Sequence, residues 1–230
     1  MLPQERLPYS AMEGRPPLKL PDGLRLILWP LMSLEQWDIS RPMARMVITP
    51  PQGQPMLPDH PNWSWHEYGM RVGFWRIHDA LRNLKIVPTL AMNGSVCTEY
   101  PRVVKAGLDA GWEPMGHASI QGPMHKLDDQ RAAIRHTIDA IKAFYGRAPR
   151  GWESPGLTET FETIDILAEE GIEYVADWVI DDQPCEIATT TGSVVAMPYT
   201  VEINDVPMMS VAQHASSEWL ARGIRQFDRM

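Results

Sequence analysis

The sequence predicts an α/β fold in which a parallel sheet is connected by crossover helices. Short apolar stretches alternate with longer stretches whose apolar residues recur at helical spacing, and short turns separate them. The chain shows no internal repeat and no linker of low complexity. Its 230 residues, 44% of them hydrophobic, are enough for one α/β barrel as a single unit.

The first half of the chain is expected to supply three strands and the helices between them. Residues 1–23 are rich in proline and are predicted to form an extended N-terminal arm, followed by a single domain over 24–230. In chain order the expected elements are a buried apolar strand (24–38), a proline-rich loop (41–62), a helix capped by Ser64 (65–84), a strand that ends at Asn93, a helix that ends at Gly111 and a short strand (112–117).

The second half continues the alternation. The clearest helix covers residues 126–145, because Ile134, Ile138 and Ile141 lie on one stripe and Gly146 follows. After it we expect a strand (149–156), a helix that Thr158 caps (158–170), a strand (173–184), a hairpin or two short strands (185–203) and a final helix from Ser216 or Ser217.

The amino-acid composition argues against two classes of binding partner. The net charge is −8 and the chain has no cluster of Lys and Arg, which argues against nucleic acid and against an anionic membrane surface. Cys97 and Cys185 form no CxxC motif, so a reducing cytoplasm is the expected location. No signal pattern opens the sequence, and no apolar run reaches the roughly 20 residues of a bilayer span.

Polar residues stand where the predicted strands end. Because chemistry in such folds gathers at the carboxyl ends of the strands, these residues are expected to share one rim. Each has a structural alternative: a single histidine is more often structural, a tryptophan can be a core residue, and adjacent aspartates can simply form a turn. The strand-end residues are Glu35, Trp37, Asp38, Asn93, His117, Trp152, Glu153, Ser154, Asp177, Trp178, Asp181 and Asp182, to which the later segment VEIND adds Glu202, Asn204 and Asp205.

Several stretches resemble the polysaccharide deacetylase superfamily. They are WEPMGH (112–117), the turn GRAPRGWESPG (146–156) and AEEGIEYVADW (168–178). The segments SLEQWD (33–38) and DWVIDDQP (177–184) are closer to the branch that holds metal-independent allantoinases and cyclic-imide hydrolases. The resemblance implies a deformed (β/α) barrel of about seven strands, hydrolysis of a carbon–nitrogen bond other than a peptide bond, and an oligomer.

The chain departs from the family pattern at several positions. Two adjacent aspartates are usual after the first strand, but only Glu35 is present here. The second histidine, four residues after His117, is replaced by Gln121, and Glu153 stands where an arginine is usual. The final leucine-histidine motif has no counterpart, so the barrel is expected to lack its last strand–helix unit. If a metal such as Zn²⁺ binds at all, the implied ligands are Glu35, His117 and His125, and binding would be weak.

The leading hypothesis is therefore a hydrolase of a small amide, ureide or cyclic imide, a small-molecule substrate. Its expected catalytic residues are Glu35, His117, Glu153 and Asp182. Its expected substrate-binding residues are Trp37, Asn93, Gln121, Trp152 and Trp178. Two alternatives remain, a metal-dependent carbohydrate N-deacetylase and a non-catalytic ligand-binding or partial barrel subunit. The proline-rich loop 41–62, which has little reason to be ordered alone, adds the expectation of a homo-oligomer.

Overall fold

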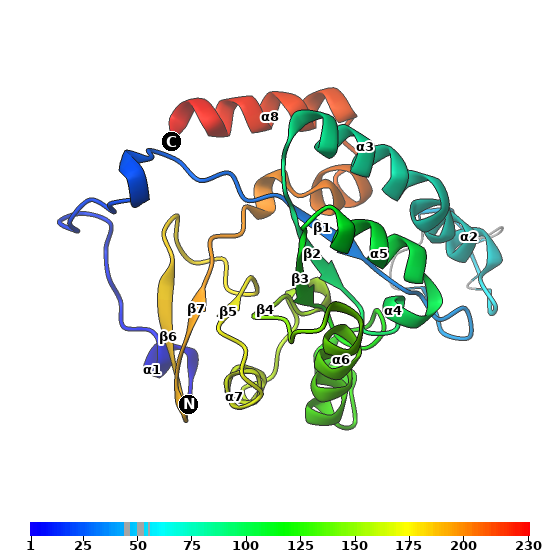
Figure 1. Ribbon diagram of the computed structural model, residues 1–230, viewed down its shortest axis with the longest axis horizontal. Coiled ribbons are helices and arrows are strands. Elements are labelled where there is room, and N and C mark those ends of the chain that lie inside the picture. Colours follow the sequence, from blue (N-terminus) through cyan, green and yellow to red (C-terminus); the bar gives the residue numbers. More distant parts are fainter. Residues whose placement is uncertain (44–46, 50–52, 55) are drawn as a thin grey trace.

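The computed structural model describes residues 1–43, 47–49, 53–54 and 56–230, and it is built on a seven-stranded sheet (Figure 1). The strand order is β1-β2-β3-β4-β5-β7-β6, with parallel pairing throughout except for the antiparallel β6–β7 hairpin. The strands are β1 (Leu31–Leu34), β2 (Thr89–Met92), β3 (Glu113–Gly116), β4 (Gly151–Trp152), β5 (Tyr174–Val175), β6 (Cys185–Thr189) and β7 (Gly192–Ala196). The predicted α/β class is confirmed. In the described part of the chain the sheet is not closed, since β1 and β6 are its edges.

The first strand is much shorter than its apolar run. Only Leu31–Leu34 of the predicted 24–38 stretch forms β1, and the side chains of Leu24, Ile27 and Leu28 are more than half exposed. Apolar character alone cannot show which part of a run will find a neighbouring strand. The prediction of a buried strand over the whole run is therefore wrong for its first half.

Helices cover the sheet in the predicted alternation. Three of their expected starts are wrong. The helix predicted over 126–145 begins at Gln130, where the Asp129 carboxylate caps it by accepting the amide N–H of Ala132. The Asp59 carboxylate, not Ser64, caps α2 by accepting the amide N–H of Asn62 at 3.1 Å. The helix predicted from Thr158 begins at Thr163, because the Thr158 hydroxyl instead accepts the amide N–H of Met124. The helices are α1 (Pro3–Arg6), α2 (His60–Tyr68), α3 (Phe74–Leu84), α4 (Val96–Glu99), α5 (Pro101–Asp109), α6 (Gln130–Tyr145), α7 (Thr163–Glu169) and α8 (Ser216–Arg229), with a π-helical turn (Gly69–Gly73) between α2 and α3.

Two groups of buried side chains join the helices to the sheet. Ile134 and Ile138 of α6 pack with Trp152 of β4 and with α7. Ile141, one turn further along α6, packs with β2 and with α3–α5. The stripe predicted for α6 thus bridges both groups, which is why this helix is the best defined in the sequence.

The N-terminal arm is attached at one buried residue. Arg6, whose side chain is 2% exposed, pairs with the Asp165 carboxylate of α7 at 2.5 Å. Its guanidinium also donates to the carbonyl oxygens of Phe161 and of Ala188 in the edge strand β6. Figure 1 shows α1 beside β6. The arm therefore ties the edge strand to α7.

The last helix, α8, lies across the end of the molecule where the chain returns from the hairpin (Figure 1). Trp219 donates to the carbonyl oxygen of Ile203 at 2.6 Å, whereas Leu220, Ile224 and Phe227 are more than half exposed. Part of the loop 41–62 lies outside the described residues, so the expected homo-oligomer stays a prediction. Over the described ranges, no helix has the length and apolarity needed to cross a membrane.

Candidate active site

Three of the strand-end residues meet in the structure. Glu35 follows β1, His117 follows β3 and Glu153 follows β4. Nε2 of His117 lies 3.6 Å from the Glu35 carboxylate, and Nδ1 lies 3.7 Å from the Glu153 carboxylate. The parallel ladder produces this convergence, because the amide N–H of His117 donates to Met92 and that of Glu153 donates to Gly116, each one step beyond a strand end.

The orientation of the His117 ring is set by the main chain. Its Nδ1 donates to the carbonyl oxygen of Glu153 at 2.7 Å, since a carbonyl can only accept. The N–H of the same peptide unit, that of Ser154, donates to Asp177 at 2.6 Å. His117 Nε2 is buried and has no hydrogen-bond partner in the described part of the chain. This nitrogen is therefore the one available for chemistry next to Glu35.

Two amide side chains hold the loops around the cluster. Gln121 donates to the Glu35 carboxylate at 3.1 Å, so the residue in the place of the family's second histidine orients the carboxylate. Asn93 is fully buried, accepts the amide N–H of Gln36 at 2.8 Å and donates to the carbonyl oxygen of His117. Gln121 borders the site, whereas Asn93 fastens the β1 and β3 loops together.

Burial and neighbouring charges shift the pKa values of the three cluster residues in different directions. Burial alone would lower the pKa of His117, but the carboxylates of Glu35 and Glu153 raise it to about 9. Burial raises the pKa of Glu35, but His117 outweighs this and the net shift is downward. Burial raises the pKa of Glu153, and His117 offsets only part of that rise. The site thus contains a Glu35 carboxylate next to a His117 imidazolium.

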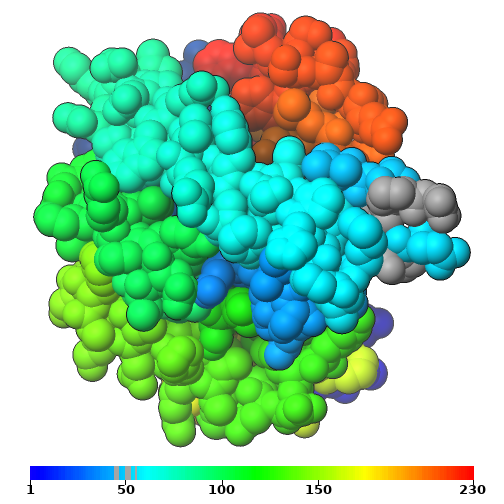
Figure 2. Space-filling view, turned by 90° about the vertical axis from the view of Figure 1, so that its right-hand side faces the viewer, coloured from blue at the N-terminus to red at the C-terminus, as the bar shows by residue number. Residues whose placement is uncertain are grey.

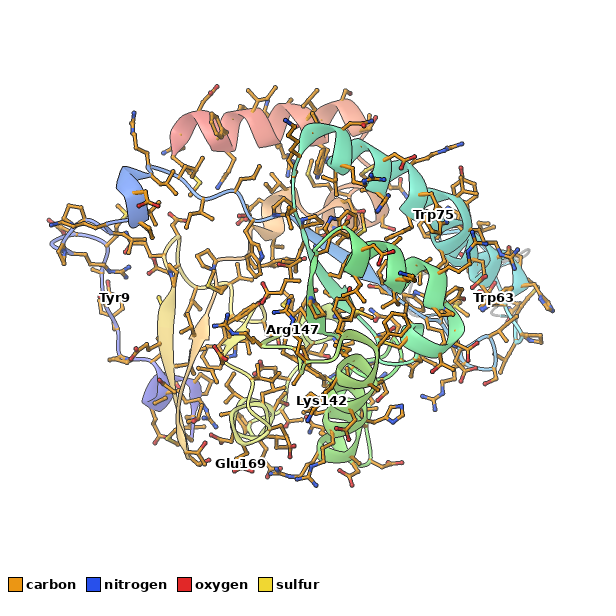
Figure 3. The ribbon with its side chains drawn as sticks, viewed as in Figure 1. Tyr9, Trp63, Trp75, Lys142, Arg147 and Glu169 are labelled. Carbon is orange, nitrogen blue, oxygen red and sulfur yellow. The ribbon has the colours of Figure 1, made fainter. Side chains whose placement is uncertain are left out.

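Trp37 contacts the same carboxylate, and His66 lies against Trp37. The Trp37 indole donates to Glu35 at 3.1 Å, and its ring stacks on the His66 imidazole with centroids 4.1 Å apart. Trp63 of α2, labelled in Figure 3, donates to the carbonyl oxygen of Trp37 at 3.2 Å. His66 lies within the helix predicted over 65–84, and no spacing in the sequence links it to this loop. Only the docking of α2 brings it there.

Four predicted site residues do not join the cluster. Trp152 is fully buried in the core, where its indole donates to the Ser154 hydroxyl, so it cannot line a substrate pocket. Trp178 donates to the Glu159 carboxylate instead. Asp182 and His125 are exposed, and among the described contacts no hydrogen bond or ion pair joins either to the cluster. Asp177, five residues before Asp182, occupies the rim because β5 ends at Val175.

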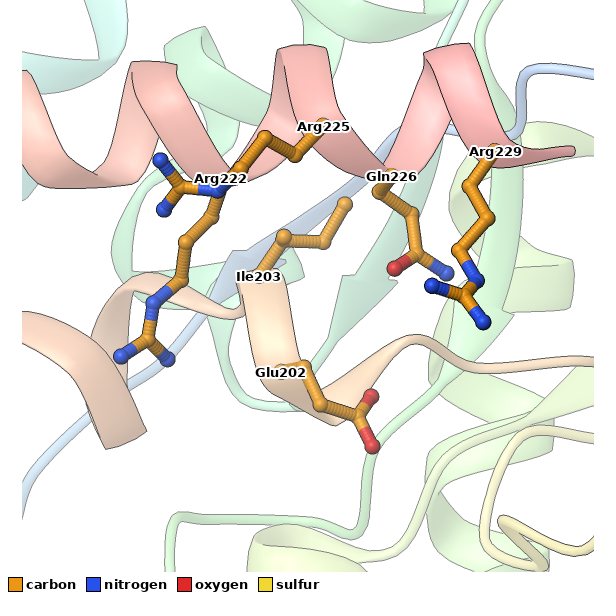
Figure 4. A pocket seen from close by; sticks show the side chains of 6 residues that line it. All are labelled: Glu202, Ile203, Arg222, Arg225, Gln226 and Arg229. Atoms are coloured by element: carbon orange, nitrogen blue, oxygen red, sulfur yellow. The ribbon is translucent and has the colours of Figure 1, made fainter.

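Access to the cluster is through Glu35. Its side chain is 26% exposed, against 3% for His117 and 6% for Glu153. Figure 2 shows the segment after β1, in blue, at the surface below the cyan helices α2 and α3. Two cavities lie elsewhere: one of about 180 Å³ under α8, lined by Glu202, Ile203, Arg222, Arg225, Gln226 and Arg229 (Figure 4), and one of about 320 Å³ beside the π-helical turn.

The cluster does not fit a zinc centre. Catalytic zinc normally takes three protein ligands, whereas only the His117 imidazole and the Glu35 carboxylate face one another here, with a carboxamide beside them. Within the described residues no three His, Cys, Asp or Glu side chains could hold a metal ion. The set implied by the resemblance, Glu35, His117 and His125, is not brought together.

A glycine before His117 permits the close packing of the cluster on the core. A Cβ at Gly116 would lie 2.4 Å from the Trp152 ring, which is fully buried and cannot move aside. We expect Gly116→Ala to lower the free energy of unfolding by about 1–3 kcal/mol, as overpacking of a core does. Chemical denaturation measures it, with Gly122→Ala as the control because a Cβ there meets nothing within 4 Å. Equal stabilities of the two variants would contradict this account.

Comparison with known proteins identifies the family. Residues 63–175 match the family model for polysaccharide deacetylase. This stretch is a polysaccharide deacetylase domain. It contains His117 and Glu153 but not Glu35, which comes from the strand before it. The resemblance predicted from WEPMGH and the following motifs is thereby confirmed at the level of the superfamily, which is one of hydrolases.

Individual relatives support the family and the fold. A candidate polysaccharide deacetylase of Schizosaccharomyces pombe is 26% identical over 162 residues, 62% of this chain and 50% of that protein. The chain thus spans about half the length of this curated relative. Among solved structures, Puue allantoinase matches with a TM-score of 0.84 and 24% identity over 96% of this chain and 78% of its own. A candidate polysaccharide deacetylase from Pseudomonas aeruginosa PAO1 matches with a TM-score of 0.77 and 22% identity, over 87% of this chain and 71% of its own. At these identities the two structures show a shared fold, the deacetylase and allantoinase type of barrel.

Proposed function

We propose that this protein hydrolyses a carbon–nitrogen bond other than a peptide bond, in a small amide, ureide or cyclic imide. The observation that carries the proposal is the pair formed by the Glu35 carboxylate and the buried His117, with His117 Nε2 free of any hydrogen bond in the described structure. Such a pair offers a base and an electrophile side by side, which is what amide hydrolysis requires.

In the proposed reaction Glu35 removes a proton from water, and the water oxygen forms a bond to the substrate carbonyl carbon. His117, protonated at both nitrogens, donates from Nε2 to the carbonyl oxygen as negative charge develops there. When the carbonyl forms again the carbon–nitrogen bond breaks, and the nitrogen leaves with its electron pair and gains a proton. Gln121 keeps Glu35 in position for the first step.

The surroundings of Glu35 favour a small planar substrate. Of the three cluster side chains only that of Glu35 is exposed by about a quarter, and the Trp37 indole donates to it. The similarity to an allantoinase structure points in the same direction, although it concerns the fold. A small planar ring or amide can stack on an indole, whereas a polysaccharide chain needs a longer cleft.

The experiment is a hydrolysis screen of purified protein, run with and without a chelator. The panel contains allantoin, hydantoin, succinimide, acetanilide and N-acetylglucosamine oligomers. We expect turnover of a small amide, ureide or imide that is unaffected by chelation, since the cluster lacks a zinc ligand set among the described residues. Release of acetate from the oligomers, abolished by chelator, would support the metal-dependent N-deacetylase that the family match favours. No turnover of any substrate would favour a non-catalytic binding subunit.

A further inference from the structure

His66 is held against the proposed site by an aromatic contact. Its imidazole stacks on Trp37 at 4.1 Å with an interplanar angle of 16°, and the Trp65 ring meets it edge-on at 5.1 Å. The bond from Trp63 to the Trp37 carbonyl fastens α2 to the same loop. The imidazole therefore has a fixed place beside the loop that carries Glu35, although 31 positions separate the two in the sequence.

One nitrogen of His66 has no structural use. Nε2 is buried and has no hydrogen-bond partner among the described residues. Nearly all buried polar atoms in folded proteins have a partner, so an exception calls for a functional explanation. His117 Nε2 is in the same condition. Two imidazoles from different elements thus lie near Glu35, His117 at 3.6 Å and His66 against the Trp37 ring that donates to it. Each has one nitrogen without a hydrogen-bond partner among the described residues.

The two histidines differ in protonation. Burial lowers the pKa of His66, and the attraction of its charged neighbours Glu35 and Asp59 does not compensate. The pKa of His117 is raised instead, to about 9. Near neutral pH one imidazole is therefore neutral and the other charged, and acid–base pairs in active sites are separated in this way. His66 in this state can accept a proton and pass it on, while His117 keeps its own.

We propose that His66 is a second acid–base residue of the site, which passes the proton taken up by Glu35 to the departing nitrogen. This rests on the proposed function. The water oxygen bonds to the carbonyl carbon and its proton goes to Glu35, then through a water molecule to His66 beside Trp37. The carbon–nitrogen bond breaks, its electron pair stays with nitrogen, and His66 protonates that nitrogen. Glu35 and His66 end in their starting states, so no further reactant is needed.

The test uses the full chain with His66→Phe, which keeps the stack on Trp37 but removes both ring nitrogens. His60→Phe is the matched control, because His60 is exposed on the same helix. We expect His66→Phe to lower kcat by about 10²–10⁴-fold with little change in KM, the usual contribution of one acid–base group. The control should keep the rate of the unchanged protein, and near-ultraviolet circular dichroism should show both variants folded.

A leaving-group comparison separates proton transfer from a structural role. On 4-nitroacetanilide, whose nitrogen needs less protonation, the loss in His66→Phe should be much smaller than on acetanilide. Added imidazole should restore part of the rate of His66→Ala. Unchanged kcat in a folded His66→Phe variant would overturn the role of His66 alone. If the unchanged protein hydrolyses none of the panel, the proposed function itself is wrong. This outcome differs from turnover that His66→Phe leaves unchanged, which contradicts only the role of His66.

Discussion

Replacing His117 by glutamine is expected to lower kcat/KM by about 10²–10⁴-fold without unfolding the protein. Glutamine can still donate to the carbonyl oxygen of Glu153, so the loop after β3 should keep its shape. It cannot supply the positive charge next to Glu35 that the imidazolium provides. The measurement is steady-state kinetics on the substrate identified by the screen, with unfolding followed in parallel. His125→Gln is the control, because His125 is exposed.

The raised pKa of His117 predicts how both activity and stability depend on pH. Activity should fall as pH rises through about 9, because His117 then loses the proton that it donates. Stability should respond in the same window. The pKa of His117 in the folded protein lies above its ordinary 6.5, so its contribution is complete below pH 6.5 and disappears towards pH 9. This part of the pH dependence should be missing in His117→Gln and present in His125→Gln. Unchanged turnover and an unchanged stability profile in a folded His117→Gln variant would assign His117 a purely structural role.

Arg6→Ala is expected to lower the free energy of unfolding by about 3–5 kcal/mol, the usual cost of breaking a buried ion pair from one side. The change removes the Arg6 donor from the carbonyl oxygens of Phe161 and Ala188 and from the Asp165 carboxylate, which keeps the amide N–H of Thr190. The hydrogen bond from Arg6 lowers the pKa of Asp165 to about 2, below its ordinary 3.8. The stabilisation is therefore present above pH 3.8 and lost as pH falls towards 2. The free energies of unfolding of the unchanged protein and of Arg6→Ala should therefore approach one another in acid.

The measurement is urea denaturation, which compares the loss in free energy of unfolding in Arg6→Ala with the loss in Arg150→Ala. Arg150 pairs with Glu173 at the surface, where both side chains are more than half exposed, and such pairs contribute little to stability because water screens them. A loss in Arg6→Ala no larger than that in Arg150→Ala would show that the N-terminal arm is not needed for stability. In that case another contact must hold the edge strand β6 to α7.

Part of the site is predictable because parallel strands impose a common direction. Every strand that runs the same way brings its carboxyl end to the same rim, so Glu35, His117 and Glu153 could be expected to meet before any coordinates were known. The replacement of a second histidine by Gln121 is likewise visible in the sequence, and with it the departure from a zinc ligand set. These inferences needed only the order of the elements and their approximate ends.

Other residues could not be assigned because strands alternate their faces residue by residue. Trp152 and Glu153 are neighbours, yet one is a core residue and the other faces His117. A shift of one position in the predicted strand would exchange them. Asp177 rather than Asp182 reaches the rim because β5 ends at Val175, whereas the apolar stretch continues beyond it. Apolar character does not mark where a strand loses its partner.

By itself the sequence determined the alternation of strands and helices, the superfamily, and a rim bearing a carboxylate and a single histidine motif. These follow from local periodicity and from short motifs, which depend only on near neighbours in the chain. The tertiary structure alone decided that His66 stacks on the tryptophan next to Glu35, that Arg6 fastens the edge strand, and that Gln121 holds the carboxylate. Each of these depends on how separate elements dock. Docking is governed by the summed burial of many side chains, so no spacing in the sequence records it.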